Sequence, residues 1–228
     1  MRTILIGDVH GCGAALNALL AKLKFRSGDT VVMLGDLFDR GPDSYGVFRT
    51  VLELDREYGD SLVLLRGNHE DYLLNENLTL LQRLAWNRVG RSATEKSFRR
   101  HGAAMEDARP FLRAKCRLFW KGEGVQAVHA GMMIDPPEAN DTHTLVHDHH
   151  VVRENRYAGP LTGVGHIALE SPTWFKGDGE TTEMLEPGRW LPLPDQGFIC
   201  IDTGCGKGGR LTAMIVSDGN YRLESVPE

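Results

Sequence analysis

The chain has no apolar run that approaches the roughly 20 residues of a transmembrane helix. Its opening stretch, MRTILIG, is too short to supply the apolar core of a signal peptide. Only four cysteines occur, none in a C-x-x-C pair, which excludes a disulfide framework for a chain of this size: Cys12, Cys116, Cys200 and Cys205. We therefore expect a cytoplasmic protein without a membrane partner.

The chain also lacks an excess of basic residues. It has 26 lysines and arginines against 31 aspartates and glutamates, for a net charge of −5. A general nucleic-acid-binding protein would usually present a basic face, so we expect no general nucleic-acid binding. A local basic pocket for a phosphorylated substrate stays compatible with this balance.

No low-complexity linker and no long repeat divides the sequence. A chain of 228 residues can form one substantial core and bury roughly 70–75% of its unfolded surface. We expect one domain, residues 1–228, in which residues 71–128 form a mainly helical insert or cap.

The N-terminal half alternates short apolar runs with amphipathic segments. Residues 3–7, 30–35 and 61–67 read as buried strands, and leucines or valines at helical spacing follow each of them. Residues 127–131 end a further strand, whereas short strands and turns follow Gly163. This pattern predicts an α/β fold with a parallel sheet, in which ligands bind beyond the carboxyl ends of the strands.

Polar residues follow these strands at the points where they end, in the stretches GDVHG, GDLFDRG and GNHE. Carboxylate, imidazole and amide oxygen form a mixed set that suits Mn²⁺, Fe or Zn²⁺. Seven such residues exceed what one ion takes, and two ions about 3.5–4 Å apart that share a carboxylate would accommodate them. The candidates are Asp8, His10, Asp36, Asn68, His69, His129 and His166.

Each motif has a purely structural alternative when taken singly. Asp8-x-His10 could be an ordinary strand-end turn, and Asn68 could be a helix N-cap, with Glu70 favourable to the helix dipole. Their joint occurrence at successive strand ends favours a site, because all the alternatives would have to hold together. Arg40 and Arg66 lie beside the candidate ligands and suit bidentate binding of phosphate, so the set indicates phosphoester hydrolysis.

These motifs, together with HAG at 129–131 and GH at 165–166, resemble the metallophosphoesterase superfamily. Their length and spacing are similar to the phosphoprotein phosphatase branch, in particular the bacterial and phage serine/threonine phosphatases of the lambda type. The resemblance implies a four-layer α-β-β-α sandwich with a dinuclear metal site at the carboxyl ends of the strands. The tail IDTGCGKGGRLTAM also resembles a strand pair that this branch shares with symmetrical diadenosine tetraphosphatases.

The resemblance also implies a role for each metal-site residue. Asp36 would bridge two divalent ions, for which Mn²⁺ is the expected metal and Fe or Zn²⁺ are alternatives. A hydroxide that bridges the ions would attack the phosphorus in line, without a phosphoenzyme. The first ion would be held by Asp8, His10 and Asp36, and the second by Asp36, Asn68, His129 and His166.

The remaining roles concern the leaving group and the phosphate. His69 would be the general acid, and Asp39 would orient it. Arg40 and Arg66 would bind phosphate oxygens, with Arg153 as the third family arginine and Arg156 as the alternative to it.

Three functions follow from this set of residues. The main prediction is a serine/threonine protein phosphatase, with dual specificity included, that acts on a phosphoprotein or phosphopeptide and also on small phosphate esters. The alternative is a symmetrical dinucleoside tetraphosphatase or another nucleotide phosphohydrolase, and the lesser alternative is a non-catalytic regulatory module. The stretch WNRVGRSATEKSF (86–98) and a chain shorter than expected for the tetraphosphatases favour the phosphatase.

Four histidines between residues 143 and 150 form a further cluster outside these motifs. They could form a secondary metal-binding or phosphate-sensing patch. We favour an exposed, solvated loop or helix end.

Overall fold

The computed structural model describes all residues from 1 to 228 and contains two β-sheets. In the first sheet, the N-terminal strands run parallel in chain order, as the alternating pattern predicted. Each of the first two strands is followed by a helix that returns the chain to the start of the next strand. These elements are β1 (Thr3–Ile6), α1 (Gly13–Leu23), β2 (Thr30–Met33), α2 (Ser44–Tyr58), β3 (Leu62–Leu65) and β4 (Cys116–Arg117).

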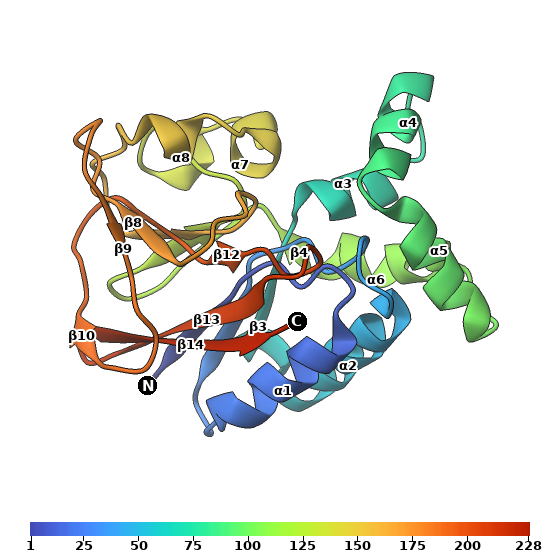
Figure 1. Cartoon of the computed structure of the whole chain (residues 1–228), viewed down its shortest axis with the longest axis horizontal. Helices are drawn as coiled ribbons and strands as arrows, with labels where there is room; N and C mark the ends of the chain where they lie inside the picture. The colour runs from blue at the N-terminus through green and yellow to red at the C-terminus, as the bar shows by residue number, and fades with distance from the viewer.

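The C-terminal part of the chain completes this sheet with antiparallel strands. A two-residue turn at Asp218 and Gly219, both at positive φ, closes the hairpin that SDGN predicts, because such a turn matches the twist of the paired strands. The hairpin pairs with the edge of β1, so the first strand of the chain and its last two lie in one sheet (Figure 1). These strands are β10 (Leu191–Pro192), β12 (Asp202–Thr203), β13 (Arg210–Ser217) and β14 (Asn220–Pro227).

The second sheet contains six strands in the order β5-β6-β7-β11-β8-β9. Its three central strands are parallel, and its outer strands are antiparallel. The strands are β5 (Phe119–Lys121), β6 (Gln126–Val128), β7 (Thr162–Val164), β8 (Thr173–Phe175), β9 (Thr182–Met184) and β11 (Phe198–Cys200).

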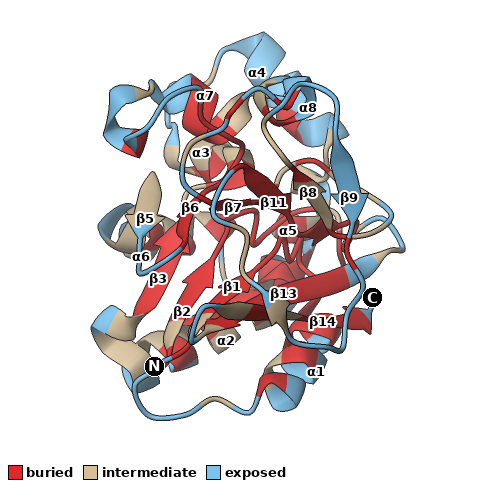
Figure 2. Ribbon diagram, turned by 90° about the vertical axis from the view of Figure 1, so that its left-hand side faces the viewer, coloured by how far each residue is buried: buried red, intermediate tan, exposed pale blue.

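Three hydrophobic clusters separate four layers. Side chains alternate along β1, so Ile4 and Ile6 pack toward α1 and α2, whereas Leu5 points into the cluster between the two sheets. A third cluster lies under two short helices on the outer face of the second sheet, α7 (Thr142–His147) and α8 (Val151–Glu154). Figure 2 shows the buried strands at the centre. The α-β-β-α sandwich is thus confirmed, and helices cover only one face of the first sheet because the second sheet covers the other.

The helical segment after β3 is shorter than the predicted insert. Residues 116–128 contain the strands β4, β5 and β6, which belong to the two sheets. Helix α4 projects from the body (Figure 1), and Trp86 is its only buried residue. None of the helices combines the length and apolar character needed to cross a membrane. The helical segment after β3 consists of α3 (Asn68–Leu74), α4 (Leu80–Arg88), α5 (Arg91–Arg100) and α6 (Arg109–Lys115). Elsewhere and within it, short 3₁₀ turns occupy Gly59–Ser61, Met105–Ala108 and Pro137–Ala139.

Candidate metal centre

The carboxyl ends of five parallel strands meet at one edge of the sandwich. The loops after β1, β2 and β3 carry candidates from the first sheet, and those after β6 and β7 carry His129 and His166 from the second. Because the two sheets face each other, seven side chains that are up to 158 residues apart in sequence converge there. All seven predicted metal and acid residues are therefore brought together.

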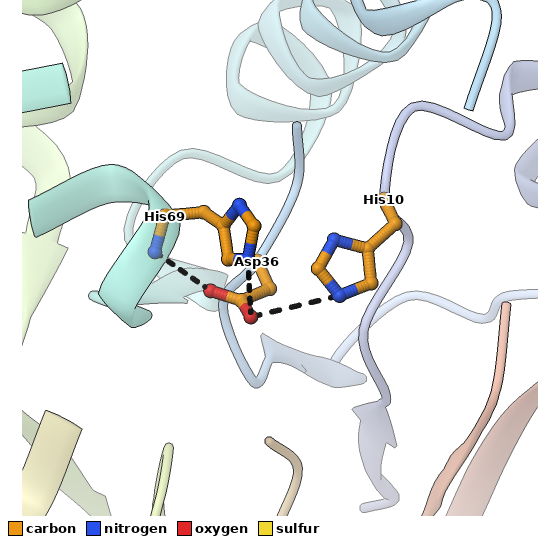
Figure 3. Close-up of side chains that lie close together, drawn as sticks. All are labelled: His10, Asp36 and His69. Carbon is orange, nitrogen blue, oxygen red and sulfur yellow. Dashed lines mark hydrogen bonds and ion pairs between the residues drawn. The ribbon is translucent and has the colours of Figure 1, made fainter. Parts of the chain in front are cut away.

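Asp36 lies at the centre of the cluster and presents one carboxylate oxygen to each side. Its Oδ2 atom lies 3.6 Å from Nε2 of His10 and 3.8 Å from Nε2 of His69. Figure 3 shows these two imidazoles converging on the same carboxylate oxygen. Asp8 adds a second carboxylate to this side, with Oδ2 4.0 Å from Nε2 of His10.

The other oxygen of Asp36 faces the second group. Oδ1 lies 3.5 Å from Nε2 of His129. The amide oxygen of Asn68 lies 3.2 Å from that same nitrogen and 3.0 Å from Nδ1 of His166. A carboxylate shared between two ligand groups is the arrangement expected for a two-metal centre.

The clustered side chains offer more acceptors than donors to one another, which fits bound cations rather than a hydrogen-bond network. His10 and His129 each donate from Nδ1 to a backbone carbonyl, of Phe38 and Leu34, so each carries a lone pair on Nε2. The lone pair of His129 faces Asp36, and that of His10 faces Asp36 and the guanidinium of Arg40. The carboxylate oxygen Oδ1 of Asp8 and Nε2 of His166 are buried without a hydrogen-bond partner. Converging lone pairs and orphaned acceptors would be costly unless positive charge lies between them.

Burial keeps most of these imidazoles neutral, as metal ligands must be. It lowers the pKa of His10 well below its ordinary value, lowers that of His129, and, reinforced by His129, lowers the pKa of His166 to about 2. Two groups have a geometry that could hold an ion: His10, Asp36 and His69, and Asp36, His129 and His166. The residues present therefore fit divalent ions, in line with the family expectation.

Backbone strain concentrates at this edge. Five of the eight non-glycine residues with positive φ belong to the predicted site: His10, Asp36, Asp39, Arg40 and His166. Such conformations cost about 1–3 kcal/mol each and persist where the surrounding structure imposes them. Glycine is required where the loops touch, since a Cβ on Gly67 would lie 2.1 Å from Oδ1 of Asp36.

Glu70 joins two of the strand-end loops, a role that its interpretation as a favourable helix-dipole residue missed. Its buried carboxylate accepts backbone N–H groups of Asp36 (2.7 Å), Leu37 (2.9 Å) and Gly67 (3.0 Å). Burial, together with the charge of Asp36, raises the pKa of Glu70 to about 7. The last letter of GNHE therefore fixes the backbone that carries the central ligand.

His69 and Asp39 form the predicted pair. Nδ1 of His69 donates to Oδ2 of Asp39 at 2.6 Å, and Nε2 of His69 faces the cluster without a hydrogen-bond partner. Burial acts to lower the pKa of His69, but Asp36 and Asp39 outweigh it and the pKa is raised. Trp86 of α4 and Thr94 of α5 also donate to Asp39, at 2.6 Å each. Sequence reasoning noted both residues within a family-like stretch and assigned them no role.

Of the predicted arginines, Arg40 contacts a candidate ligand and Arg66 lies on the loop after β3. Nη1 of Arg40 contacts Nε2 of His10. Arg66 follows β3 directly; its Nη1 lies 3.5 Å from Oδ1 of Asp71, and its Nε is buried without a partner. The Arg40 guanidinium therefore lies beside a candidate ligand, whereas the charged partner of Arg66 is Asp71 on α3.

Arg153 lies farther out. It is exposed on α8, and its charge acts with burial to lower the pKa of His149. The ring of His149 stacks on that of His166 with centroids 4.1 Å apart, so Arg153 approaches the site through this histidine. Arg156, the alternative, is exposed beyond the end of α8.

The histidine cluster at 143–150 is only partly the solvated loop that we favoured. His143, His149 and His150 are exposed. His147, in contrast, lies with Nε2 2.9 Å from Oδ2 of Asp71, and His149 stacks on His166. The interpretation is thus wrong for His147, which is half-buried because α7 packs over α3, whereas His149 is exposed as expected, although its ring lies against that of His166.

A family model described as calcineurin-like phosphoesterase matches residues 1–189. The chain belongs to the calcineurin-like phosphoesterase family. This confirms the metallophosphoesterase resemblance drawn from the strand-end motifs, and membership makes the chain a metallophosphoesterase hydrolase whose family employs divalent metal ions.

Curated relatives of this phosphoesterase match along nearly the whole chain. A symmetrical bis(5'-nucleosyl)-tetraphosphatase from Escherichia coli O17:K52:H18 is 52% identical over an alignment of 280 positions, which covers 98% of this chain and 95% of that protein. A protein of the same description from Shigella boydii serotype 18 matches with the same identity and coverage. The alignment has more positions than the 228 residues of this chain, yet it covers nearly all of both proteins, which outweighs the length argument made from sequence.

Solved structures share the fold at low sequence identity. A metallophosphoesterase from Sphaerobacter thermophilus has a TM-score of 0.67 at 16% identity, with 99% of this chain and 88% of that chain covered. A cold-active protein-tyrosine phosphatase from a Shewanella species has a TM-score of 0.61, also at 16% identity, with 99% and 80% covered. These likenesses establish the architecture alone.

Proposed function

We propose that this phosphoesterase is a symmetrical dinucleoside tetraphosphatase, which adds water across the central P–O–P bond and releases two nucleoside diphosphates. The observation that carries the proposal is the 52% identity to symmetrical bis(5'-nucleosyl)-tetraphosphatases over almost the whole of both chains. The relatives favour this alternative over the predicted serine/threonine protein phosphatase, and they give no support to a phosphoprotein substrate.

The strand-end cluster would hold the two divalent ions. Bound ions supply an activated water and neutralise charge on the phosphate oxygens. Imidazole, carboxylate and amide ligands suit Mn²⁺, with Fe or Zn²⁺ as the alternatives. The proposed ligands are Asp8, His10, Asp36, Asn68, His129 and His166.

The side chains around the cluster would handle the substrate. Arg40 and Arg66 carry the donors suited to nonbridging phosphate oxygens, and Arg153 could reach only a more distal phosphate from its place on α8. His69 holds a proton on Nδ1 against Asp39 and, in its protonated form, gives the proton on Nε2 to the oxygen of the leaving group. Burial of both residues keeps bulk water away from this pair.

The test is a product analysis of the Mn²⁺-loaded protein. Diadenosine tetraphosphate and a phosphothreonine peptide are offered at equal concentration, and nucleotides are separated by ion-exchange chromatography. We expect ADP as the only nucleotide product and a large preference for the dinucleotide. Formation of AMP with ATP would overturn the symmetrical cleavage, and preference for the peptide would restore the protein-phosphatase prediction. An Asp36→Asn variant, which should lose metal and turnover, serves as the catalytic control.

A further inference from the structure

Thr94 holds one oxygen of the Asp39 carboxylate through its hydroxyl group, whose proton and two lone pairs each have an identified hydrogen-bond partner. Its single proton goes to Oδ1 of Asp39, because a carboxylate oxygen can only accept. Its two lone pairs accept from the backbone N–H of Asp39 (2.8 Å) and from the hydroxyl of Ser44 (3.0 Å). Thr94 is 1% exposed, so water cannot replace any of these bonds.

Trp86 holds the other oxygen. Its indole N–H donates to Oδ2 of Asp39, the same atom that accepts from Nδ1 of His69. Two further groups pack on the indole: the ring of Tyr72 stacks on it, with centroids 6.1 Å apart, and the guanidinium of Arg91 lies 4.9 Å from the ring centroid. Thr94 and Trp86, which belong to the helical segment after β3, thus hold the two carboxylate oxygens of Asp39 in place.

We propose that Trp86 and Thr94 are positioning residues that hold Asp39, and through it His69, in the orientation for proton donation. The proposal rests on the proposed role of His69 as general acid. Trp86 is the only buried residue of α4, and α4 meets the body where the indole reaches Asp39. The helical segment therefore serves the chemistry, although it contributes no metal ligand.

The test compares leaving groups in the Mn²⁺-loaded enzyme. Departure of 4-nitrophenolate needs no proton, whereas phenolate is more basic and benefits from the acid. We expect Trp86→Phe and Thr94→Val each to lower the ratio of kcat for phenyl phosphate to kcat for 4-nitrophenyl phosphate by about tenfold, part of the 10²–10⁴ that an acid supplies. The KM values should not change, because neither residue faces the substrate.

Three controls separate the explanations. Thr94→Ser keeps the hydroxyl and should restore the ratio relative to Thr94→Val. Trp174→Phe removes an indole that donates to the carbonyl of Gln196, far from the site, and should leave the ratio at the wild-type value. His69→Asn should lower the ratio at least as far as the positioning variants do. Bound metal and the unfolding temperature are measured for every variant.

Equal losses on both substrates, or metal loss in Trp86→Phe and Thr94→Val, would show a structural role and overturn the positioning proposal alone. An unchanged ratio in His69→Asn would overturn the acid role in the proposed function and the positioning proposal with it. Should Thr94→Val fail to fold, Trp86→Phe, which keeps a ring of similar shape, decides the matter.

Discussion

Replacing Glu70 by glutamine tests the claim that a residue outside the ligand set assembles the metal centre. The glutamate accepts three backbone N–H groups with two oxygens: Oε2 takes those of Asp36 and Gly67, and Oε1 takes that of Leu37. A glutamine has the same shape but only one acceptor oxygen. Its amide oxygen can replace Oε2, and its NH₂ group then faces the N–H of Leu37.

The magnitude follows from that mismatch. One buried donor loses its acceptor, which costs about 1–3 kcal/mol. The hydrogen bonds to the N–H groups of Asp36 and Gly67 become weaker because their acceptor is no longer charged. This loss is offset because glutamine avoids the cost of burying a charge, the same cost that raises the pKa of Glu70. For a chain of this length, a loss of this size lowers the unfolding temperature by about 2–12 °C. Since total stabilities are about 5–15 kcal/mol, the variant should still fold.

The assay is urea unfolding of the metal-free protein, followed by titration with Mn²⁺. We expect Glu70→Gln to bind Mn²⁺ about 10–100-fold more weakly, as is typical when a group that supports metal ligands is lost. Glu53→Gln, on the exposed face of α2, is the matched control and should match the wild type in both measurements. Stability and affinity of Glu70→Gln equal to those of the control would refute the reasoning.

Three further predictions follow. Asp36→Asn should lose metal and turnover, whereas His69→Asn should keep its metal and lose about 10²–10⁴ in kcat for phenyl phosphate, whose leaving group needs a proton; equal metal loss in both would contradict the assigned roles. Chelation should abolish activity and Mn²⁺ restore it, as followed with diadenosine tetraphosphate. Burial acts to raise the pKa of Asp29, but hydrogen bonds from Arg2 outweigh it and lower that pKa, so the stabilisation is present above about pH 4 and lost as pH falls. Urea unfolding between pH 3 and 7 should show that loss in the wild type and not in Asp29→Asn.

The sequence predicts the ligands because their placement depends on topology alone. Parallel strands that alternate with helices bring their carboxyl ends to one edge, whatever the details of packing. The residues that directly follow β1, β2 and β3 therefore had to be neighbours, and those after β6 and β7 joined them once the second sheet packed on the first. The residue types at Asp218 and Gly219 likewise predict the tight hairpin turn that the structure shows there.

The sequence pattern does not predict contacts that depend on how the helices pack in three dimensions. Trp86 and Thr94 lie 47 and 55 residues after Asp39, and only the path of α4 and α5 brings them to its carboxylate. Glu70 carries an ambiguous signal, because a carboxylate in the first turn of a helix is favourable for the helix itself. His147 was judged from polarity alone, which says nothing about α7 packing on α3.

The substrate was the hardest prediction for a chemical reason. Metal ions and arginines recognise the phosphate group, which esters and anhydrides share, so the strand-end motifs cannot separate a phosphopeptide from a dinucleotide. What differs between them is the basicity of the leaving group: a serine alkoxide needs a proton, whereas a nucleoside diphosphate leaves readily as an anion. The buried assembly around His69 would therefore matter less for a tetraphosphate than for an unactivated ester. The leaving-group dependence of Trp86→Phe and His69→Asn therefore tests whether His69 acts as the general acid. The nucleotide products test whether the substrate is a dinucleoside tetraphosphate. One of these two proposals can be refuted while the other stands.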